Sequence, residues 1–410
     1  MPSLSIVIPA YNEEASIASI IERCLAVREA LRLEAQLDWV EVIVVSDGSS
    51  DRTAEIAAGY PDIKLIAYQH NRGYGAALKL GFATGKGDIV GFLDADGTCD
   101  PRTFILMCQE MIRQQADIVL GSRLHKESKM PRVRRVGNRV YAIIMSLIAN
   151  TLITDTASGM RIIRRRALDK LYPLPNGLHF TPAMSCKAVL DPDLKIVEIP
   201  MPYEEREGRS KLSVVRDGLR FLNVILDISL SYRPRKLIGL LGWLLLLIAG
   251  LYSLYPVEFY LRHHRLEEWM IYRLITIMVL AVGGLNVISI GEIAERMLEA
   301  AGYRRSSRSF INYILGRLFS QHSVLIWGTA AIILGLTINL GNIIQYITTG
   351  TVTAHWSYII FGGMTVLTGM QLIGLGLLLR FTGFLITRLQ PETESSLPTP
   401  LVTPQSSQHV

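Results

Sequence analysis

The stretch Ile89-Val-Gly-Phe-Leu-Asp-Ala-Asp96 joins a short apolar run to two carboxylates. An apolar run of this length between turn residues is typical of a buried β-strand. Because the two aspartates follow at the point where the strand leaves the core, both side chains can reach one ion. Carboxylate oxygens are the ligands that Mg²⁺ and Mn²⁺ prefer. The stretch therefore predicts a buried strand that ends in a metal site, although two aspartates in a solvated turn have the same pattern.

Short β-branched runs alternate with helical segments on both sides of this stretch. This alternation predicts a parallel sheet covered by helices. We expect strands at Ser5–Ile8, Glu41–Val45, Lys64–Ala67, Ile89–Leu93 and Asp117–Leu120, with helices at Ala15–Leu33, Asp51–Ala58, Gly75–Ala83 and Pro101–Arg113.

Ligands bind at the carboxyl ends of the strands in such sheets. Carboxylates follow three of the expected strands, in Pro9-Ala-Tyr-Asn-Glu-Glu14, Ser46-Asp-Gly-Ser-Ser-Asp51 and Asp94-Ala-Asp96. The sequence therefore predicts one acidic crevice at this edge of the sheet.

The C-terminal half of the 410-residue chain is far more apolar. No formal charge occurs in Leu237–Val257 or Leu274–Gly291, and His355 is the one ionisable residue between Ser323 and Leu379. Each run reaches the roughly 18 apolar residues that suggest a membrane span. Since Thr348-Thr-Gly-Thr351 predicts a loop inside the last run, we expect four transmembrane helices. A soluble apolar core is disfavoured, because buried soluble helices rarely exclude charge over such lengths.

The flanking charges predict an integral, multi-pass membrane protein whose first domain is cytoplasmic. Leu4–Ala10 gives way at once to Asn12-Glu-Glu14, so no secretory signal is expected. The loop between the second and third spans is rich in arginine, which favours the cytoplasmic face, whereas Arg262 and Arg265 are a weak counter-signal. The net charge of +6 suits a membrane surface better than nucleic acid. The four cysteines, without a CxxC spacing, are expected to be reduced thiols.

Two basic segments have amphipathic helical patterns, Val133–Ile153 and Lys211–Tyr232. We expect both helices to lie in the membrane surface, the alternative being that they simply pack on the sheet. The predicted organisation is an α/β domain over residues 1–210, an amphipathic interfacial helix and linker over 211–236, a four-helix transmembrane domain over 237–390 and a disordered tail over 391–410.

An ordered set of motifs carries a family resemblance over Leu4 to Lys236. The chain resembles the family-2 glycosyltransferases of the GT-A fold, and within them the dolichol-phosphate mannose synthase and polyprenyl-phosphate glycosyltransferase group. This resemblance implies a Rossmann-like catalytic domain. The motifs are Pro9-Ala-Tyr-Asn-Glu-Glu14, Asp47-Gly-Ser-Ser-Asp-Arg-Thr53, Asn71-Arg-Gly-Tyr-Gly75, Asp94-Ala-Asp96, Gly121-Ser-Arg123, Asp155 with Ser158-Gly159, and Arg206-Glu-Gly-Arg-Ser-Lys-Leu212.

The resemblance also implies roles for individual residues. The catalytic group that handles the diphosphate and the acceptor phosphate is Asp96, Arg123, Arg206 and Lys211. The nucleotide sugar is held by Pro9, Ala10, Tyr11, Glu13, Val45, Asp47, Asp94, Ala95, Ser158 and Gly159, with Asp47 accepting hydrogen bonds from the base or ribose. The Mg²⁺ or Mn²⁺ ligands are Asp94 and Asp96, with Thr98 as a neutral ligand or through water. Gly159 is equally typical of a turn, and Lys211 of a contact with lipid headgroups.

The chain departs from the family pattern in three places. Ser46 replaces the first of two aspartates, and Thr98 stands where an amide or hydroxyl often assists the metal. No carboxylate occurs in His179-Phe-Thr-Pro-Ala-Met-Ser-Cys186. A sugar hydroxyl must lose a proton to attack, whereas a lipid monophosphate is already largely anionic at neutral pH, because its second pKa is about 6. A missing base therefore favours a phosphate acceptor.

The expected function is an inverting transfer of one hexose from GDP-mannose or UDP-glucose to a polyprenyl or dolichyl phosphate in the bilayer. A processive polysaccharide synthase is the nearest alternative, but the chain has no Gln-x-x-Arg-Trp motif. A sugar nucleotidyltransferase would need a glycine-rich loop where Pro9-Ala-Tyr-Asn12 stands. A lipid-sugar flippase or scaffold with a degenerate first domain is disfavoured by the retention of both Asp94 and Asp96. The oligomeric state stays open, a homo-oligomer included, and no nucleic-acid partner is expected.

Overall fold

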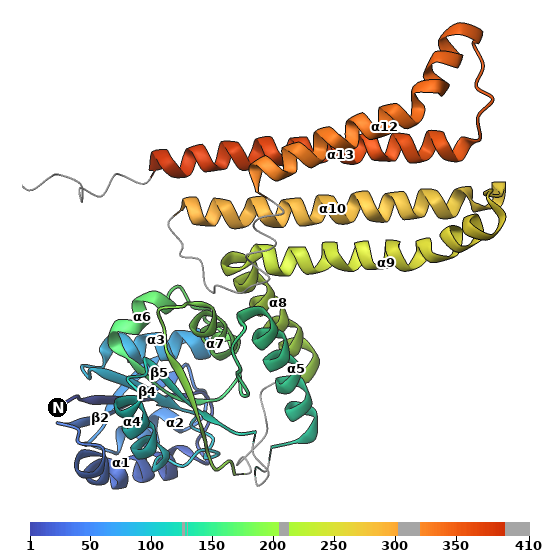
Figure 1. Ribbon diagram of the computed structural model, residues 1–410. Helices are drawn as coiled ribbons and strands as arrows, with labels where there is room; N and C mark the ends of the chain where they lie inside the picture. Colours follow the sequence, from blue (N-terminus) through green and yellow to red (C-terminus); the bar gives the residue numbers. More distant parts are fainter. Residues whose placement is uncertain (125–127, 129, 205–212, 302–319, 390–410) are drawn as a thin grey trace, which may run out of the picture. The chain divides into compact units, whose positions relative to one another are not determined.

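The computed structural model describes residues 1–124, 128, 130–204, 213–301 and 320–389 (Figure 1). The chain divides into two units, Met1–Leu237 and Ile238–Val410. Arg206 and Lys211, predicted to bind phosphate, lie outside the described residues, as does the expected tail.

The first unit is built on a seven-stranded sheet with the order β3-β2-β1-β4-β6-β5-β7. The strands are β1 Leu4–Ala10, β2 Val40–Asp47, β3 Lys64–Tyr68, β4 Ile89–Leu93, β5 Ile118–Ser122, β6 Met160–Arg164 and β7 Ile196–Pro200. The five expected strands all form. They run in the same direction, as predicted, and the sheet as a whole is mixed because an additional strand, β6, runs antiparallel to both β4 and β5. An apolar strand pattern sets which residues are buried and carries no information about direction.

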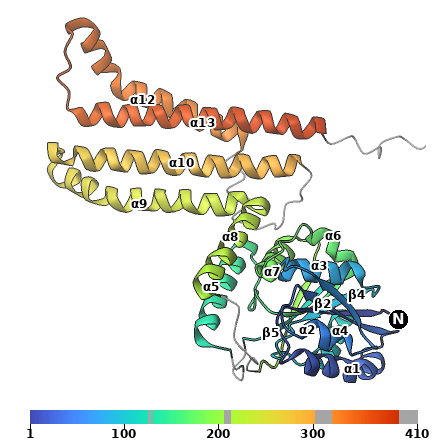
Figure 2. The same cartoon turned by 180° about the vertical axis from the view of Figure 1, so that it is seen from behind.

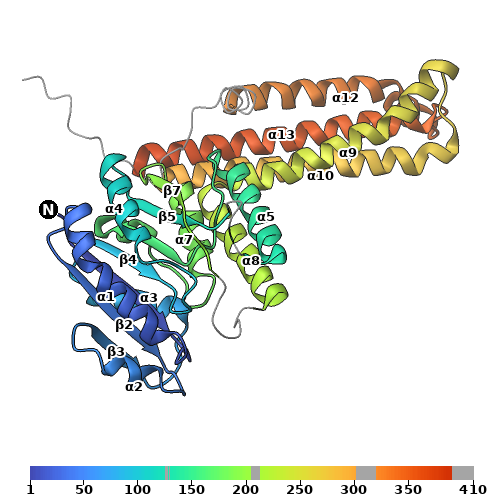
Figure 3. The same ribbon diagram turned by 90° about the horizontal axis from the view of Figure 1, so that it is seen from below.

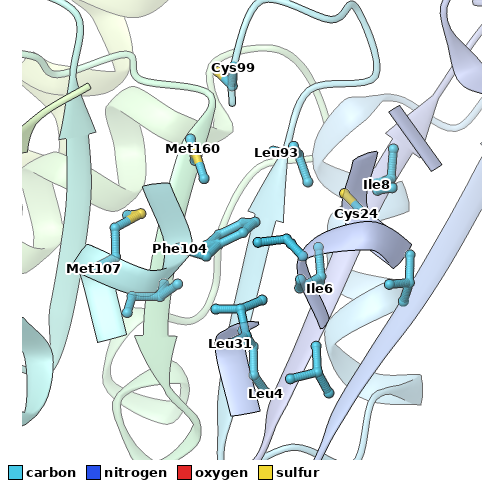
Figure 4. Close-up of a cluster of buried hydrophobic side chains, with 14 of the residues drawn as sticks. Leu4, Ile6, Ile8, Cys24, Leu31, Leu93, Cys99, Phe104, Met107 and Met160 are labelled. Carbon is cyan, nitrogen blue, oxygen red and sulfur yellow. The ribbon is translucent and has the colours of Figure 1, made fainter. Parts of the chain in front are cut away.

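Helices cover both faces of this sheet. Alternate side chains of β1 point to opposite faces: Leu4, Ile6 and Ile8 pack with α1 (Ile17–Glu34) and α4 (Thr103–Arg113) (Figure 4). Val7 packs on the other face with α3 (Tyr74–Thr84) and α7 (Phe180–Leu190), and α6 (Arg165–Leu171) contributes to the same cluster. A short helix, α2 (Thr53–Ala58), precedes β3. The strand ends are thus fixed by two apolar layers.

Two longer helices of the first unit, α5 (Arg132–Ala149) and α8 (Val214–Tyr232), lie side by side (Figure 3). The Tyr141 hydroxyl donates to the Gly218 carbonyl at 2.9 Å, and its ring meets Phe221 edge-on. A Cβ on Gly218 would lie 3.0 Å from that hydroxyl, so the glycine permits the close approach. Both predicted amphipathic helices therefore exist, and each buries one side in the first unit.

The second unit contains helical hairpins (Figure 2). Its long helices are α9 (Pro234–His263), α10 (Ile271–Ala300), α12 (Gln321–Thr349) and α13 (Trp356–Leu389), and the 3-10 turn Glu268–Met270 precedes α10. Within the part of the chain that the structure describes, four segments are long and apolar enough to cross a membrane, Pro234–His263, Glu268–Ala300, His322–Thr349 and Trp356–Leu385. The predicted fold class is therefore confirmed: an α/β domain precedes helices of which four are candidate spans.

Glycines set how closely these helices pack. A Cβ on Gly242 would lie 2.7 Å from the Gly284 carbonyl oxygen, and one on Gly335 would lie 2.6 Å from that of Gly362. Small residues of this kind let helix backbones approach in membranes. The expected break in the last apolar run is present, since α12 ends at Thr349 and is followed by Gly350, which has φ 73°.

Candidate active site

A pocket of about 510 Å³ opens where β1, β2 and β4 end. It brings together most residues predicted to hold the nucleotide sugar, metal or phosphate. Those that line it are Pro9, Ala10, Tyr11, Glu13, Asp47, Asp94, Ala95, Asp96, Arg123 and Gly159. Val45, Thr98 and Ser158 stand behind the lining, since none of the three is among the lining residues and all are buried.

Asp94 is confined on two sides. The Tyr74 hydroxyl donates a hydrogen bond to Asp94 Oδ1 at 2.7 Å. A Cβ placed on Gly159 would lie only 1.9 Å from Asp94 Oδ2, so glycine is required there for this carboxylate to keep its place. Burial, and then the charge of Asp94, raises the pKa of Tyr74 well above its ordinary value, so the hydroxyl stays a donor at neutral pH. Sequence reasoning missed Tyr74, because a tyrosine within a glycine-rich turn has no chemical signature of its own.

Asp96 has a hydroxyl donor of its own. The Thr98 hydroxyl donates to Asp96 Oδ1 at 2.7 Å, and the Thr98 backbone N–H donates to the same oxygen at 3.2 Å. Thr98 therefore orients the carboxylate from behind the pocket. Whether it also serves a metal ion stays a prediction.

The donor set fits a divalent ion that is shared with a ligand. Among the described residues, no group of three or more His, Cys, Asp or Glu side chains is arranged to hold a metal. Asp94 and Asp96 supply two carboxylates in one pocket. Mg²⁺ is commonly bound in this way, through one or two carboxylates together with substrate phosphates and water. These residues therefore suit an ion that binds together with a diphosphate.

Asp47 binds backbone groups of a neighbouring turn. Its two carboxylate oxygens accept hydrogen bonds from the N–H groups of Arg72 and Gly73, both at 2.8 Å. The next residue, Gly48, has φ 69°, and a Cβ there would lie 2.4 Å from the Asn71 backbone nitrogen. The predicted contact of Asp47 with a base or ribose stays a prediction, and in the described structure the carboxylate organises this turn.

The loop after β1 rests on the loop after β2. Asn12, at φ 51°, accepts a hydrogen bond from the Ser50 N–H at 2.8 Å, and the Glu13 N–H donates to Thr53 Oγ1 at 2.8 Å. The motif Asp47–Thr53 thereby supports the segment that presents Tyr11 to the pocket. The Tyr11 ring is 37% exposed, so it offers an open face for stacking.

Arg123 is tied to a buried carboxylate. Its Nε and one terminal nitrogen donate to the two oxygens of Asp155, each at 2.8 Å, and Asn138 donates to Asp155 at 2.8 Å. Burial alone would raise the pKa of Asp155, but Arg123 and Asn138 hold it below its ordinary value. The ion pair fixes Arg123 at the pocket wall, and the predicted contact of Arg123 with phosphate stays a prediction.

The segment before Gly159 is supported from inside the core. The Ser158 hydroxyl donates to the Gly121 carbonyl at 2.5 Å, while Arg161 donates to the carbonyls of Ser158 and Thr156. Burial lowers the pKa of Arg161 to about 10, so it remains a cation at neutral pH. Ser158 therefore acts through the backbone, and Gly159 is the member of the pair that reaches the pocket.

Two further arginines line the pocket, Arg134 from α5 and Arg220 from α8. Their sequence pattern was interpreted only as the polar side of an amphipathic helix, and pairing of the two helices at the pocket is what turns them inward. The carboxylates of the described lining are Glu13, Asp47, Asp94 and Asp96, and the segment near Thr181 adds none.

Comparisons with known proteins match both parts of the chain. Residues 5–172 match the model of glycosyl transferase family 2, and residues 234–390 match a domain of unknown function, DUF8752. The chain is 31% identical over 255 residues to the low-salt glycan biosynthesis hexosyltransferase Agl6 of Haloferax volcanii, covering 60% of each chain.

Two other relatives are covered over more of their length. The dolichyl-phosphate hexose transferase of the same organism is 29% identical, with 57% of this chain and 96% of the relative covered. The undecaprenyl-phosphate 4-deoxy-4-formamido-L-arabinose transferase of Pectobacterium atrosepticum is 30% identical, with 62% of this chain and 75% of the relative covered.

Proposed function

Since the chain belongs to glycosyltransferase family 2, we propose that it transfers one hexose from a nucleotide sugar to a polyprenyl or dolichyl phosphate. One observation carries this proposal: carboxylates from strand ends and arginines from α5 and α8 line the same pocket. The names of two relatives contain dolichyl phosphate and undecaprenyl phosphate, which supports a lipid phosphate acceptor. GDP-mannose and UDP-glucose are the proposed donors.

The donor is proposed to lie against the ends of β1, β2 and β4. Pro9 and Tyr11 would orient the nucleoside, while Asp94 and Asp96 would hold Mg²⁺ or Mn²⁺. When bound, such an ion neutralises the charge that develops on the departing diphosphate. Tyr74 and Thr98 keep the two carboxylates in place, so little reorganisation is needed when the donor arrives.

The acceptor phosphate is proposed to bind the arginines of the pocket. Arg134 and Arg220 lie on the two paired helices, and Arg123 is fixed beside them by Asp155. Arg206 and Lys211, outside the described residues, are proposed to join them.

The outer side of α5 supports a lipid acceptor. It exposes a stripe of large apolar side chains at helical spacing, Val136, Val140, Ile143 and Leu147. An exposed apolar stripe of this kind beside basic residues is typical of a helix that lies in a membrane interface. The helix that carries Arg134 would therefore hold the pocket at the depth of lipid headgroups.

The reaction needs no proton acceptor from the protein. A phosphate oxygen of the lipid attacks the anomeric carbon, and the bond from that carbon to the nucleoside diphosphate breaks, with inversion of configuration. The phosphate is largely a dianion above pH 6, so its oxygen is already nucleophilic. Among the described lining residues, the segment His179–Cys186 contributes no carboxylate, which suits this chemistry.

The test is transfer by the purified full chain in nanodiscs, with a panel of radiolabelled nucleotide sugars. We expect one GDP- or UDP-hexose to label polyprenyl phosphate when Mg²⁺ or Mn²⁺ is present. Polyprenol, which differs only in lacking the phosphate, is the matched control and should stay unlabelled. Labelling of polyprenol at the same rate, or growth of a polysaccharide chain, would refute the proposal in favour of a hydroxyl acceptor.

The proposed location is an integral membrane protein with its first unit in the cytoplasm. The four candidate spans support membrane insertion, and the proposed domain limits are residues 1–210, 211–236, 237–390 and 391–410. Cysteine accessibility decides the orientation. A cysteine placed at residue 265 should react with a membrane-impermeant maleimide in intact cells, whereas one at residue 29 should react only after lysis.

A further inference from the structure

The turn Asn71–Gly75 connects two strand ends of the pocket that are not neighbours. Asp47, at the end of β2, accepts hydrogen bonds from the N–H groups of Arg72 and Gly73 at 2.8 Å. The next residue, Tyr74, donates to Asp94, which follows β4, at 2.7 Å. β1 lies between these two strands in the sheet. The turn therefore connects Asp47 to Asp94 through hydrogen bonds.

The turn itself is held against a second segment. Gly73 has φ 102°, and a Cβ on it would lie 2.5 Å from the Asn176 carbonyl oxygen. The Gly75 N–H donates to that same oxygen at 2.6 Å, and a Cβ on Gly75 would lie 2.2 Å from the Pro175 carbonyl oxygen. Both glycines are needed because the two backbones touch. Tyr74 thus starts from a backbone with little freedom to move.

The position of Asp94 depends on this arrangement. The Tyr74 hydroxyl donates to Asp94 Oδ1, and Asp94 Oδ2 occupies the space that a side chain at position 159 would fill. A hydrogen bond to a charged acceptor is among the stronger hydrogen bonds in proteins. The Tyr74 hydroxyl therefore contributes to the direction of the Asp94 carboxylate.

We propose that Tyr74 is a positioning residue for Asp94, and that Asp47 acts on the divalent-cation site through the turn Asn71–Gly75. This inference rests on the proposed binding of a metal ion with a nucleoside diphosphate. In addition to any contact with the nucleoside, the Asp47 carboxylate then fixes the turn Asn71–Gly75, and this turn fixes the position of Tyr74.

The test measures how much a metal ion strengthens nucleotide binding. For the full chain in detergent, the dissociation constants for UDP and GDP are determined by calorimetry without and with saturating Mn²⁺, and their ratio is the metal-dependent gain. Direct contacts of Asp47 with the nucleoside cancel in this ratio. We expect Tyr74→Phe to reduce the gain by about 10- to 100-fold, as for other groups that orient metal ligands. The variant should stay folded, and its metal-free nucleotide affinity should change less than its affinity with Mn²⁺.

A matched control is present on the surface. The Tyr60 hydroxyl donates to Glu22 at 2.8 Å, so Tyr60→Phe removes the same type of bond away from the pocket and should leave the gain unchanged. Asp47→Ala should reduce the gain although its side chain is no metal ligand. When Asp47→Ala is combined with Tyr74→Phe, the metal-dependent gain should fall little further than in the single variants, because both substitutions break the same connection.

Four results would overturn the inference. The first is a wild-type gain in folded Tyr74→Phe, and the second is an equal loss of affinity with and without Mn²⁺, which a merely structural role would give. The third is a full gain in Asp47→Ala, and the fourth is a wild-type protein with no gain at all. The ratio of dissociation constants is independent of the transfer assay, because it is measured without an acceptor. Failure to label polyprenyl phosphate would refute the proposed function but would not change this ratio.

Discussion

Asp155 is the buried charge on which the wall of the pocket depends. Replacing it with asparagine leaves Arg123 buried beside a neutral partner, and breaking a buried pair in this way costs about 3–5 kcal/mol. We therefore expect Asp155→Asn to lower the free energy of unfolding by about this amount, measured by denaturant unfolding in detergent. Asp193→Asn breaks a surface pair with Lys170 and should change it by less than about 1 kcal/mol. Equal effects of the two substitutions would contradict this view.

The pH dependence of that stability follows from the depressed pKa of Asp155. A carboxylate whose pKa is lower in the folded protein stabilises it above the unfolded pKa, which is about 3.9. The contribution is lost as the pH falls through the folded pKa, below that value. The difference in unfolding free energy between wild type and Asp155→Asn should therefore be constant from pH 5 to 7 and shrink on acidification below about 4. A difference in unfolding free energy that grows on acidification would contradict this prediction.

Asp96 differs from Asp155 because its carboxylate faces the pocket. We expect Asp96→Ala to abolish hexose transfer while the protein stays folded and inserted, since the side chain lines the pocket and is proposed to bind the ion. Radiolabel transfer and the unfolding temperature are the two measurements. Asp100→Ala, at a 43% exposed carboxylate near Arg23, is the control and should keep wild-type activity. Normal metal-dependent activity in Asp96→Ala would remove Asp96 from the metal site.

At the scale of elements, the exposed apolar stripe of α5 predicts how strongly the chain binds its lipid acceptor. Val140→Ser with Ile143→Ser removes two exposed apolar side chains, 47% and 53% accessible, from its outer stripe. We expect KM for polyprenyl phosphate to rise at least about tenfold, which is 1.4 kcal/mol and less than the free energy of burying two such side chains. Nucleotide affinity should not change. The same change at Leu106 and Ile112, each 43% exposed on α4, is the control. An equal effect of both pairs would argue against a membrane role for α5.

The sequence predicted elements better than their directions and partners. The five expected strands and the loop that begins at Gly350 could be predicted, because apolar runs and turn glycines are local signals. β6 and its reversal were not, since strand direction is set by the connection through α5. At the site, the carboxylates followed from strand ends. Tyr74, Arg134 and Arg220 did not, because their roles arise from contacts between segments far apart in the chain.

For the whole molecule, the acceptor sets the pH dependence of the rate. If a lipid phosphate attacks without a protein base, the rate of transfer should rise with pH through about 6, the second phosphate pKa. It should then stay level until the metal site or the fold fails. Initial rates at saturating donor give the profile, and nucleotide binding measured over the same range is the control that should stay flat. A carboxylate outside Asp47, Asp94 and Asp96 whose removal stops chemistry without weakening donor binding would restore a conventional base.

The reversed strand β6 has a consequence for how such an enzyme can diversify. Strands β3, β2, β1 and β4 come from the chain before residue 94, and β6, β5 and β7 come from the chain after residue 117, so each half of the sheet is also one half of this unit's sequence. The two halves join along β4 and β6. A single genetic crossover between α4 and β5 would therefore exchange the strand ends that carry Asp47, Asp94 and Asp96 and keep α5 and α8, which carry Arg134 and Arg220. Such an exchange would have to preserve the close contact of Gly159 with Asp94, because that contact joins the two halves within the pocket.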